Sequence, residues 1–301
     1  MADVFDPGKQ TKPELNRRVF VGIGAGAAAV GSTIAAALAQ AEGFGKPHPP
    51  IVPENDPAIV VSRPGLPTGI PAYAAVPKNA TMTTPGVVVI QAIWGVDAQL
   101  TDVVRRFAKE GFVAIAPALF ARQNPPSGDG LTDYTVFVPF ASKLDTRQVN
   151  GDAGAAADWI RKRAGVGPKV RPPKVGITGF CMGGTIVLRQ MWQNPAPFDA
   201  AAIWYGNPRQ DPTGEPLTDA NLRYVDQIKS PIEGNFGGRD TGPPPADVRL
   251  FESKLKVPND IKIYDAAGHG FFDDTRGSYV ASAASDAWTR TLAFFRKYLA
   301  A

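Results

Sequence analysis

The sequence is poor in the residues that form cross-links and bind transition metals. Its 301 residues include one cysteine, Cys181, and two histidines, His48 and His269. A single cysteine excludes an internal disulfide framework and any multi-cysteine metal site, and two histidines exclude a three-histidine zinc site. Few side chains are left that can carry nucleophilic chemistry, and we expect neither a metal nor an organic cofactor.

Clusters of positive charge are also lacking. The net charge is only +4, and no run of Lys and Arg is longer than residues 161–163, so the sequence gives little support to nucleic-acid binding. Apolar residues make up 44% of the chain and charged residues 20%, which is too apolar for a disordered protein. The composition therefore predicts a globular protein with one sizeable core.

The N-terminal segment has the pattern of an export signal. Residues 19–39 are uncharged, rich in Gly and Ala and only mildly hydrophobic, and Arg17 and Arg18 precede them. Two arginines followed by a variable residue, a Phe and an apolar residue resemble the twin-arginine signal, and a small-x-small cleavage pattern ends the segment. We therefore predict a twin-arginine signal peptide over residues 1–41, with a buried N-terminal helix or a membrane anchor as alternatives.

This interpretation implies recognition by the twin-arginine export machinery and a periplasmic or secreted protein. After cleavage we expect no stable membrane anchor. Residues 42–57 are rich in proline and polar residues and are expected to form a linker or a surface wrap. His48 lies in this segment and is expected to be a solvated linker histidine.

Strand-like and helix-like segments alternate along the rest of the chain. Continuous apolar runs predict strands that are buried on both faces, and apolar residues at helical spacing predict helices. The expected strands lie at 86–92, 112–116, 175–179, 200–205, 232–236 and 261–264, and the expected helices at 100–107, 145–164, 185–192, 245–256 and 279–299. The alternation predicts one α/β domain over residues 58–301, a mostly parallel central sheet with helices on both faces.

A strand, a sharp turn and a helix meet at Cys181. The sequence Gly179-Phe-Cys-Met-Gly-Gly184 follows an expected strand and opens an expected helix, as in the nucleophile elbow. The glycines allow the tight turn, which lifts the sulfur clear of the sheet, and the helix N-terminus favours the thiolate. A buried structural cysteine beside two packing glycines is the alternative interpretation.

The partners that a nucleophile requires follow it in the expected order. Asp240 comes just after the strand at 232–236, and His269 comes just after the strand at 261–264. In an elbow-bearing fold an acid and then a histidine follow the nucleophile, so we expect Cys181, Asp240 and His269 to meet. Asp265, Asp273 and Asp274 compete with Asp240 for the acid position.

These residues resemble a known family. The chain from about residue 58 to 300 is similar to the dienelactone hydrolases (carboxymethylenebutenolidases), which have the α/β-hydrolase fold. The resemblance rests on the segments at 88–96, 121–123, 179–184, 237–240, 267–271 and 278–284. It implies a hydrolase that cleaves a small-molecule ester or lactone through an acyl-enzyme, with Cys181 as nucleophile, His269 as base and Asp240 orienting the histidine.

The resemblance also implies roles for three further residues. The backbone N–H groups of Ile93 and Met182 match the family's oxyanion hole, and Arg122 matches its arginine for the substrate carboxylate. Two positions depart from the family pattern: Ala92 stands where relatives place a Glu, and Asp273 stands where relatives place a second arginine, which Arg276 could replace. An exported binding protein that retains the fold, or an acyltransferase or thioesterase that uses the same residues, are the alternative functions.

Overall fold

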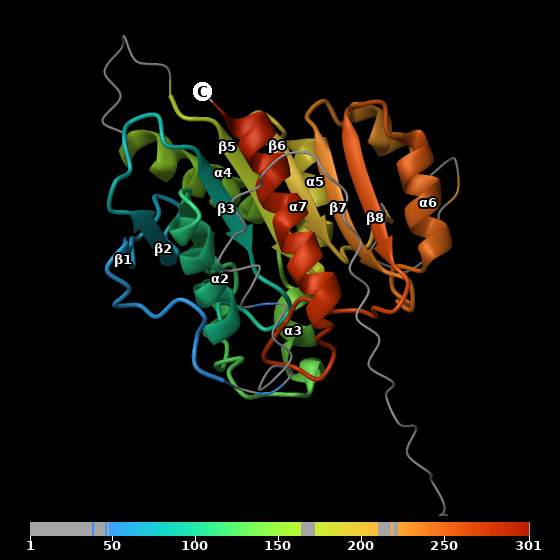
Figure 1. The fold of residues 1–301 in the computed structure, drawn as a ribbon, viewed down its shortest axis with the longest axis horizontal. Helices are drawn as coiled ribbons and strands as arrows, with labels where there is room; N and C mark the ends of the chain where they lie inside the picture. The colour runs from blue at the N-terminus through green and yellow to red at the C-terminus, as the bar shows by residue number, and fades with distance from the viewer. Residues whose placement is uncertain are drawn as a thin grey trace, which may run out of the picture. The chain divides into compact units, whose positions relative to one another are not determined.

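The computed structural model describes residues 48–163, 172–209 and 222–300, together with Leu38, Lys46 and Thr218 (Figure 1). Within these residues, eight strands form one sheet in the order β1-β2-β4-β3-β5-β6-β7-β8. The strands are β1 (Ile59–Ser62), β2 (Ala72–Pro77), β3 (Gly86–Ile90), β4 (Val113–Pro117), β5 (Val175–Phe180), β6 (Ala200–Trp204), β7 (Ile232–Gly237) and β8 (Asn259–Tyr264). Only the β1–β2 and β2–β4 pairs are antiparallel among these strands, which confirms the predicted mostly parallel sheet.

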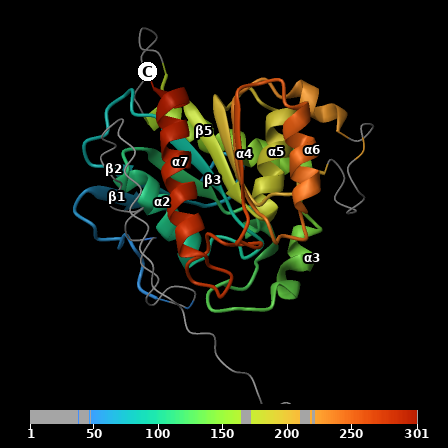
Figure 2. The same cartoon turned by 45° about the vertical axis from the view of Figure 1, so that its right-hand side comes forward.

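Helices cover both faces of this sheet (Figures 1 and 2). One face carries α2 (Ala98–Lys109) and α7 (Ala281–Leu299), and the other carries α4 (Thr146–Arg163), α5 (Met182–Gln193) and α6 (Pro245–Lys254). The short elements are η1 (Ala121–Gln123), η2 (Tyr134–Phe137), α3 (Val138–Ala141) and η3 (Arg223–Gln227). This is the α/β-hydrolase arrangement that the sequence predicts.

The central strands are apolar throughout because both of their faces are buried. In β3, Val87 and Val89 pack with α2 and α7, whereas Val88 and Ile90 pack on the opposite side. All five residues of β3 are buried, as are all five of β4. An uninterrupted apolar run is the expected sequence of a parallel strand covered on both sides.

The two N-terminal strands were not among the predicted elements. β1 has four residues and lies at the sheet edge, which leaves Val60 half exposed. β2 reads AYAAVP, and alanine and proline are depleted in strands. β2 forms nevertheless because its six residues are all buried between β1 and β4.

The proline-rich segment packs against the domain from residue 51 onward. The backbone N–H groups of Ile51 and Val52 each donate to the Asp102 carboxylate on α2, at 2.9 Å, and the Val52 side chain is buried. The expectation of a solvated His48 is wrong. The His48 side chain is only 10% exposed, and its Nε2 lies 3.6 Å from Oδ1 of Asp274. The proline-rich segment at residues 48–57, called the wrap below, therefore holds this ring against the domain.

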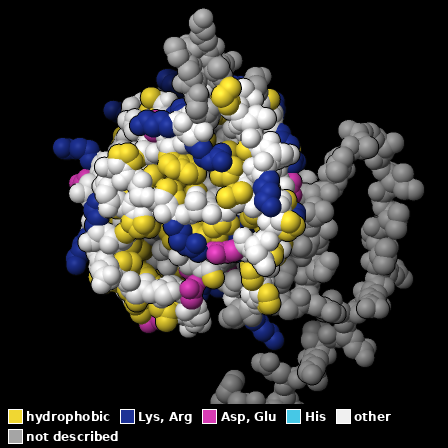
Figure 3. Space-filling model, turned by 90° about the vertical axis from the view of Figure 1, so that its left-hand side faces the viewer, with side chains coloured by type: hydrophobic (Ala, Val, Ile, Leu, Met, Phe, Trp, Pro, Cys, Tyr) yellow, Lys and Arg dark blue, Asp and Glu magenta, His cyan; other side chains and the backbone are white. Residues whose placement is uncertain are grey.

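The predicted signal peptide lies outside the described residues, apart from Leu38. Leu38 is fully buried in the apolar cluster beneath α2 and α7, and its carbonyl accepts a hydrogen bond from the Tyr279 hydroxyl. No helix in the described part of the chain combines the length and apolar character that a bilayer span requires. On the face shown in Figure 3, apolar side chains occupy much of the centre, and basic side chains are scattered among them and along the margin.

A buried group of charges ties α2 to the loop that follows β8. Arg106 is fully buried, and its Nη2 donates to Asp102 at 2.6 Å and to Asp274 at 2.5 Å. Burial raises the pKa of Asp274, although the charge of Arg106 opposes the shift. Removing one partner would leave a carboxylate buried without its counter-charge, which costs far more free energy than a surface pair contributes.

We predict that Arg106→Met lowers the free energy of unfolding by about 3–5 kcal/mol, because it removes the arginine that pairs with buried Asp274 and one of the cationic partners of Asp102. Arg296→Met is the matched control, since Arg296 pairs with Glu110 while half exposed and its loss should cost about 1 kcal/mol or less. Urea unfolding of both variants measures the difference. Equal losses in the two variants would contradict a structural role for the buried group.

Candidate active site

Cys181 lies between β5 and α5 in a strained backbone conformation. Its φ is 56° and its ψ is −120°, which a residue with a Cβ atom seldom adopts outside functional turns. The Cys181 N–H donates to the Trp204 carbonyl at 3.0 Å, and the Cys181 carbonyl accepts from the Thr185 N–H at 3.2 Å. These bonds hold the turn, and the side chain projects at the N-terminus of the 12-residue helix α5.

Two glycines are required for this turn. A Cβ atom at Gly179 would lie 2.4 Å from the Gly183 carbonyl oxygen. A Cβ atom at Gly183 would lie 2.5 Å from the carbonyl oxygens of both Ile90 and Gln91. Because these neighbours are backbone atoms, they cannot rotate away, and the first turn of α5 can approach the end of β3 only if both positions are glycine.

His269 and Asp240 meet beside this turn, from the ends of β8 and β7. Nδ1 of His269 lies 2.8 Å from Oδ2 of Asp240, whose side chain is buried, and the other Asp240 oxygen accepts from the Gly242 N–H at 2.8 Å. The Cys181 side chain lies close enough to the imidazole to help raise the pKa of His269. The structure therefore brings together the three residues that the sequence predicts to meet.

The surroundings of His269 favour its protonated form. Burial lowers its pKa, but the hydrogen bonds to Asp240 and Cys181 and the negative charges on these two groups outweigh burial and raise the pKa of His269 to about 10. The ring therefore carries a positive charge at neutral pH beside the Cys181 side chain. A cationic neighbour is typical of an activated cysteine nucleophile.

The segment that contains Ile93 runs beside the first turn of α5. The contact of Gly183 with the carbonyls of Ile90 and Gln91 places the end of β3 against this turn. Met182 is the first residue of α5, so its N–H has no acceptor within the helix. The assignment of the Ile93 and Met182 N–H groups as oxyanion donors remains a prediction.

Both candidate substrate arginines have protein partners. Arg122 on η1 donates to both oxygens of Asp152, at 2.7 and 2.9 Å, and to the Thr68 carbonyl. Arg276 stacks on the Trp94 ring, 3.7 Å from its centroid, and its Nε donates to Asp273 at 2.9 Å. The predicted substrate contact of Arg122 would have to compete with Asp152.

Tyr205 is a site residue that the sequence pattern does not reveal. Its ring contacts the His269 ring edge to face, with centroids 5.2 Å apart, and its φ is +41°. The only sequence signal is its place directly after β6, next to the strand that carries Cys181. Within the described residues, no group of three or more His, Cys, Asp or Glu side chains is arranged to hold a metal ion.

A mostly parallel sheet with this strand order, an elbow after β5 and a His–Asp pair after β8 and β7 define an α/β hydrolase. The family model of the dienelactone hydrolase family matches residues 70–299. The chain therefore belongs to the dienelactone hydrolase family.

Individual relatives agree with this assignment. The chain is 34% identical to a candidate carboxymethylenebutenolidase of Escherichia coli K12 over 275 residues, which cover 87% of this chain and 97% of the relative. It is 36% identical to a Synechocystis protein of the same description, over 76% of this chain and 92% of the relative. The crystal structure of a candidate dienelactone hydrolase from Klebsiella pneumoniae superposes with a TM-score of 0.69 at 33% identity, and the match covers 80% of this chain and all of the other.

We predict that Gly183→Ala lowers the free energy of unfolding by about 1–3 kcal/mol, because the new methyl group overlaps two backbone carbonyls. The same substitution at Gly151 on α4, where a Cβ atom meets nothing within 4 Å, should be neutral or stabilising by about 0.5–1 kcal/mol. Urea unfolding compares the two variants. A Gly183→Ala protein as stable as Gly151→Ala would show that the elbow has room to relax.

Proposed function

We propose that this protein is a thiol-dependent hydrolase that cleaves an ester or a lactone through an acyl-enzyme. The observation that carries the proposal is the placement of Cys181 on a strained elbow in contact with His269, which in turn bonds the buried Asp240. Membership of the dienelactone hydrolase family supports the reaction class.

In the proposed reaction, the Cys181 thiol proton passes to Nε2 of His269, and Sγ attacks the substrate carbonyl carbon. The N–H groups of Ile93 and Met182 stabilise the resulting oxyanion. The carbonyl re-forms as the C–O bond breaks, and His269 gives its proton to the departing alkoxide. A water molecule then loses a proton to His269 and attacks the thioester, which releases the acid and the thiol.

Ala92 makes His269 the sole proton acceptor in this scheme. Ala92 stands where the family resemblance places a Glu, and a methyl group cannot take a proton. Asp240 is already bonded to His269 and to the Gly242 N–H. We therefore assign deprotonation of Cys181 to His269, with Asp240 fixing the ring orientation.

Two alternative functions share the same residues. A non-catalytic binding protein would retain the fold without a reactive thiol, and an acyltransferase or thioesterase would release the acyl group to another acceptor or accept it from a thiol. The strained elbow argues against the first alternative, because strain of this kind is retained at functional sites. Product analysis with a competing alcohol separates hydrolysis from acyl transfer. Export by the twin-arginine route remains a prediction.

We predict that Cys181→Ala abolishes hydrolysis of p-nitrophenyl acetate, and that His269→Ala lowers kcat/KM by about 10³-fold or more, because nucleophile and base act as a unit. Asp240→Asn should have a smaller but substantial effect, since the ring loses its charged partner. Steady-state kinetics measure these changes. Near-full activity of Cys181→Ala would show that another group is the nucleophile.

The raised pKa of His269 predicts a pH window for thiol reactivity. The His269 ring stays positively charged until the pH approaches about 10, and this charge stabilises the anionic sulfur that attacks iodoacetamide. Wild-type protein should therefore be alkylated by iodoacetamide faster than His269→Ala at pH 6–7, and the two rates should converge as the pH rises toward 10.

Mass spectrometry measures this alkylation without ambiguity, because Cys181 is the only thiol in the chain. Unfolded protein at each pH is the reference for a thiol without protein partners. A wild-type rate equal to that of His269→Ala throughout the range would contradict proton transfer between the two residues and would favour the binding-protein alternative.

A further inference from the structure

Tyr205 lies beside the nucleophile, at the end of the neighbouring strand. β5 and β6 pair in parallel with Phe180 opposite Trp204, and the Cys181 N–H donates to the Trp204 carbonyl at 3.0 Å, so residue 205 stands next to the elbow. Tyr205 is buried, and its ring lies edge to face with the His269 ring, with centroids 5.2 Å apart. The side chain therefore packs on the base of the proposed reaction.

The backbone of Tyr205 is strained. Its φ of +41° lies in the left-handed region, which disfavours every residue that carries a Cβ atom. Glycine would adopt this conformation without strain, and glycine does occupy the next position, Gly206. A buried tyrosine in a conformation that suits glycine is typical of a position where the side chain itself has a function.

Contacts on both sides hold the backbone in this conformation. The Tyr205 N–H donates to the Asn235 carbonyl on β7 at 2.8 Å. Directly after it, Gly206 lies so close to the first turn of α5 that a Cβ atom there would be 2.3 Å from the Gly184 carbonyl carbon. Residue 205 is therefore fixed between β7 and the helix that begins at the elbow.

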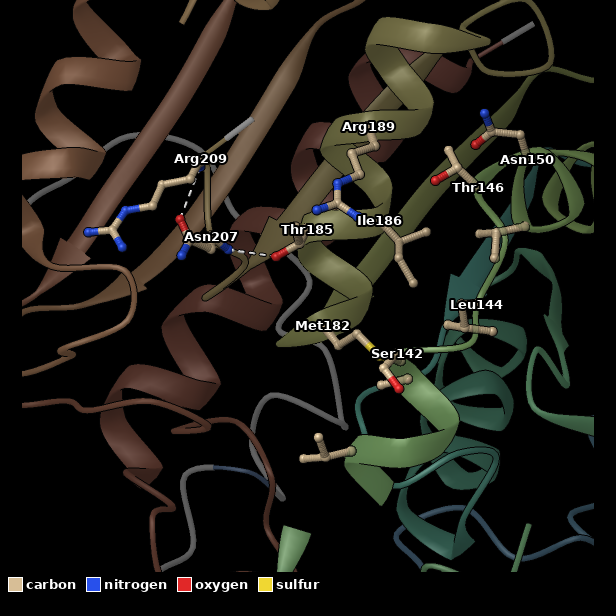
Figure 4. Close-up of a pocket in the computed structure, with 13 residues that line it drawn as sticks. Ser142, Leu144, Thr146, Asn150, Met182, Thr185, Ile186, Arg189, Asn207 and Arg209 are labelled. Atoms are coloured by element: carbon tan, nitrogen blue, oxygen red, sulfur yellow. Dashed lines mark hydrogen bonds between the residues drawn. The ribbon is translucent and has the colours of Figure 1, made fainter. Parts of the chain in front are cut away.

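The residues that follow are fastened to the same helix. The Asn207 N–H donates to the Thr185 hydroxyl on α5 at 2.8 Å, and the Asn207 side-chain oxygen accepts from the Arg209 N–H at 3.0 Å (Figure 4). Together with Met182, these residues line a cavity of about 360 Å³ along α5. The chain after β6 is thus tied to α5, which fixes the place from which the Tyr205 ring extends.

The hydrogen bond to Asp240 fixes only one atom of the His269 ring. Nδ1 lies 2.8 Å from Oδ2 of Asp240, and the His269 side chain is 40% exposed. A ring held at a single atom can tilt about that atom, and a tilt displaces the opposite nitrogen, Nε2, which must exchange protons with the thiol and the leaving oxygen. The Tyr205 ring packs on the imidazole and opposes this motion.

Tyr205 is not suited to transfer protons itself. Burial raises the pKa of Tyr205 well above its usual value, and negatively charged neighbours, of which Asp273 has the largest effect, raise it further. The phenol therefore stays neutral throughout the pH range in which the enzyme is folded and active. The contribution that remains is the packing of the aromatic ring.

We propose that Tyr205 is a positioning residue of this hydrolase, whose ring holds the His269 imidazole so that Nε2 faces the thiol and the departing oxygen. The proposal rests on the proposed hydrolase function and adds a residue to it. Asp240 sets the position of Nδ1, and Tyr205 sets the tilt of the ring. Tyr205 thereby acts on the step in which His269 gives its proton to the departing oxygen.

The test compares phenyl acetate with p-nitrophenyl acetate, which share an acyl group. p-Nitrophenolate is a weak base and leaves without a proton, whereas phenolate is a stronger base and depends more on the proton of His269. Tyr205→Leu should lower the phenyl-to-p-nitrophenyl ratio of kcat/KM by about 3–10-fold, the effect of losing one aromatic contact. Tyr205→Phe keeps the ring and should keep this ratio within about twofold of wild type.

The ratio is insensitive to a loss of folded protein, because unfolded molecules hydrolyse neither ester. Tyr224→Leu is the matched control, since Tyr224 is equally buried and its ring packs on Trp192 in the last turn of α5, so its ratio should equal that of wild type. An unchanged ratio in Tyr205→Leu would overturn the proposal. A ratio as low in Tyr205→Phe as in Tyr205→Leu would also overturn it, because the hydroxyl and not the ring would then be the active group.

Cys181→Ala separates failure of this proposal from failure of the hydrolase function. If wild-type protein hydrolyses neither ester faster than Cys181→Ala does, the hydrolase function itself is wrong. If both esters are hydrolysed through Cys181 but Tyr205→Leu leaves the ratio unchanged, only the assignment of Tyr205 is overturned. Urea midpoints show that each compared protein is folded. If Tyr205→Leu does not fold, Tyr205→Met takes its place, and an unchanged ratio in that variant overturns the assignment in the same way.

Discussion

The first turn of α5 lies so close to the end of β3 that no Cβ atom fits at Gly183. This contact fixes the start of the helix, and the chain can enter it from β5 only through the strained conformation of Cys181. The same contact places the segment after β3 beside the helix N-terminus. The sulfur, the helix terminus and the candidate oxyanion donors are therefore positioned by one close approach between two backbone segments, and no side-chain interaction could substitute for it.

His269 lies on the loop that follows β8, and buried polar contacts hold this loop in place. His269 bonds Asp240 from the end of the adjacent strand, and five residues later Asp274 is held by Arg106 of α2. Asp102, which also binds Arg106, accepts the backbone N–H groups of the wrap at residues 51 and 52. A chain of buried hydrogen bonds thus links the wrap, α2 and the histidine loop. Each buried charge in it has an oppositely charged neighbour, which favours one arrangement because an alternative would leave a charge buried alone.

The sequence predicts those parts of the molecule that depend on local pattern. The strand at β3 and the elbow at Cys181 follow from a continuous apolar run and from closely spaced glycines. β2 is missed because its alanines carry little strand preference and it forms only through burial between neighbours. The burial of His48 is also missed, since Asp274 lies more than two hundred residues away. The cavity beside Met182 is formed by α3, α4, α5 and the chain after β6, and no single segment shows the pattern.

The arginines show why a motif does not by itself define a binding residue. The resemblance predicts that Arg122 binds a substrate carboxylate, yet Asp152 on α4 already supplies a carboxylate to the same guanidinium. Arg276 is likewise held by Asp273, in the very position where relatives carry an arginine, and by the Trp94 ring. In each case an internal acid takes the place that a substrate carboxylate would occupy.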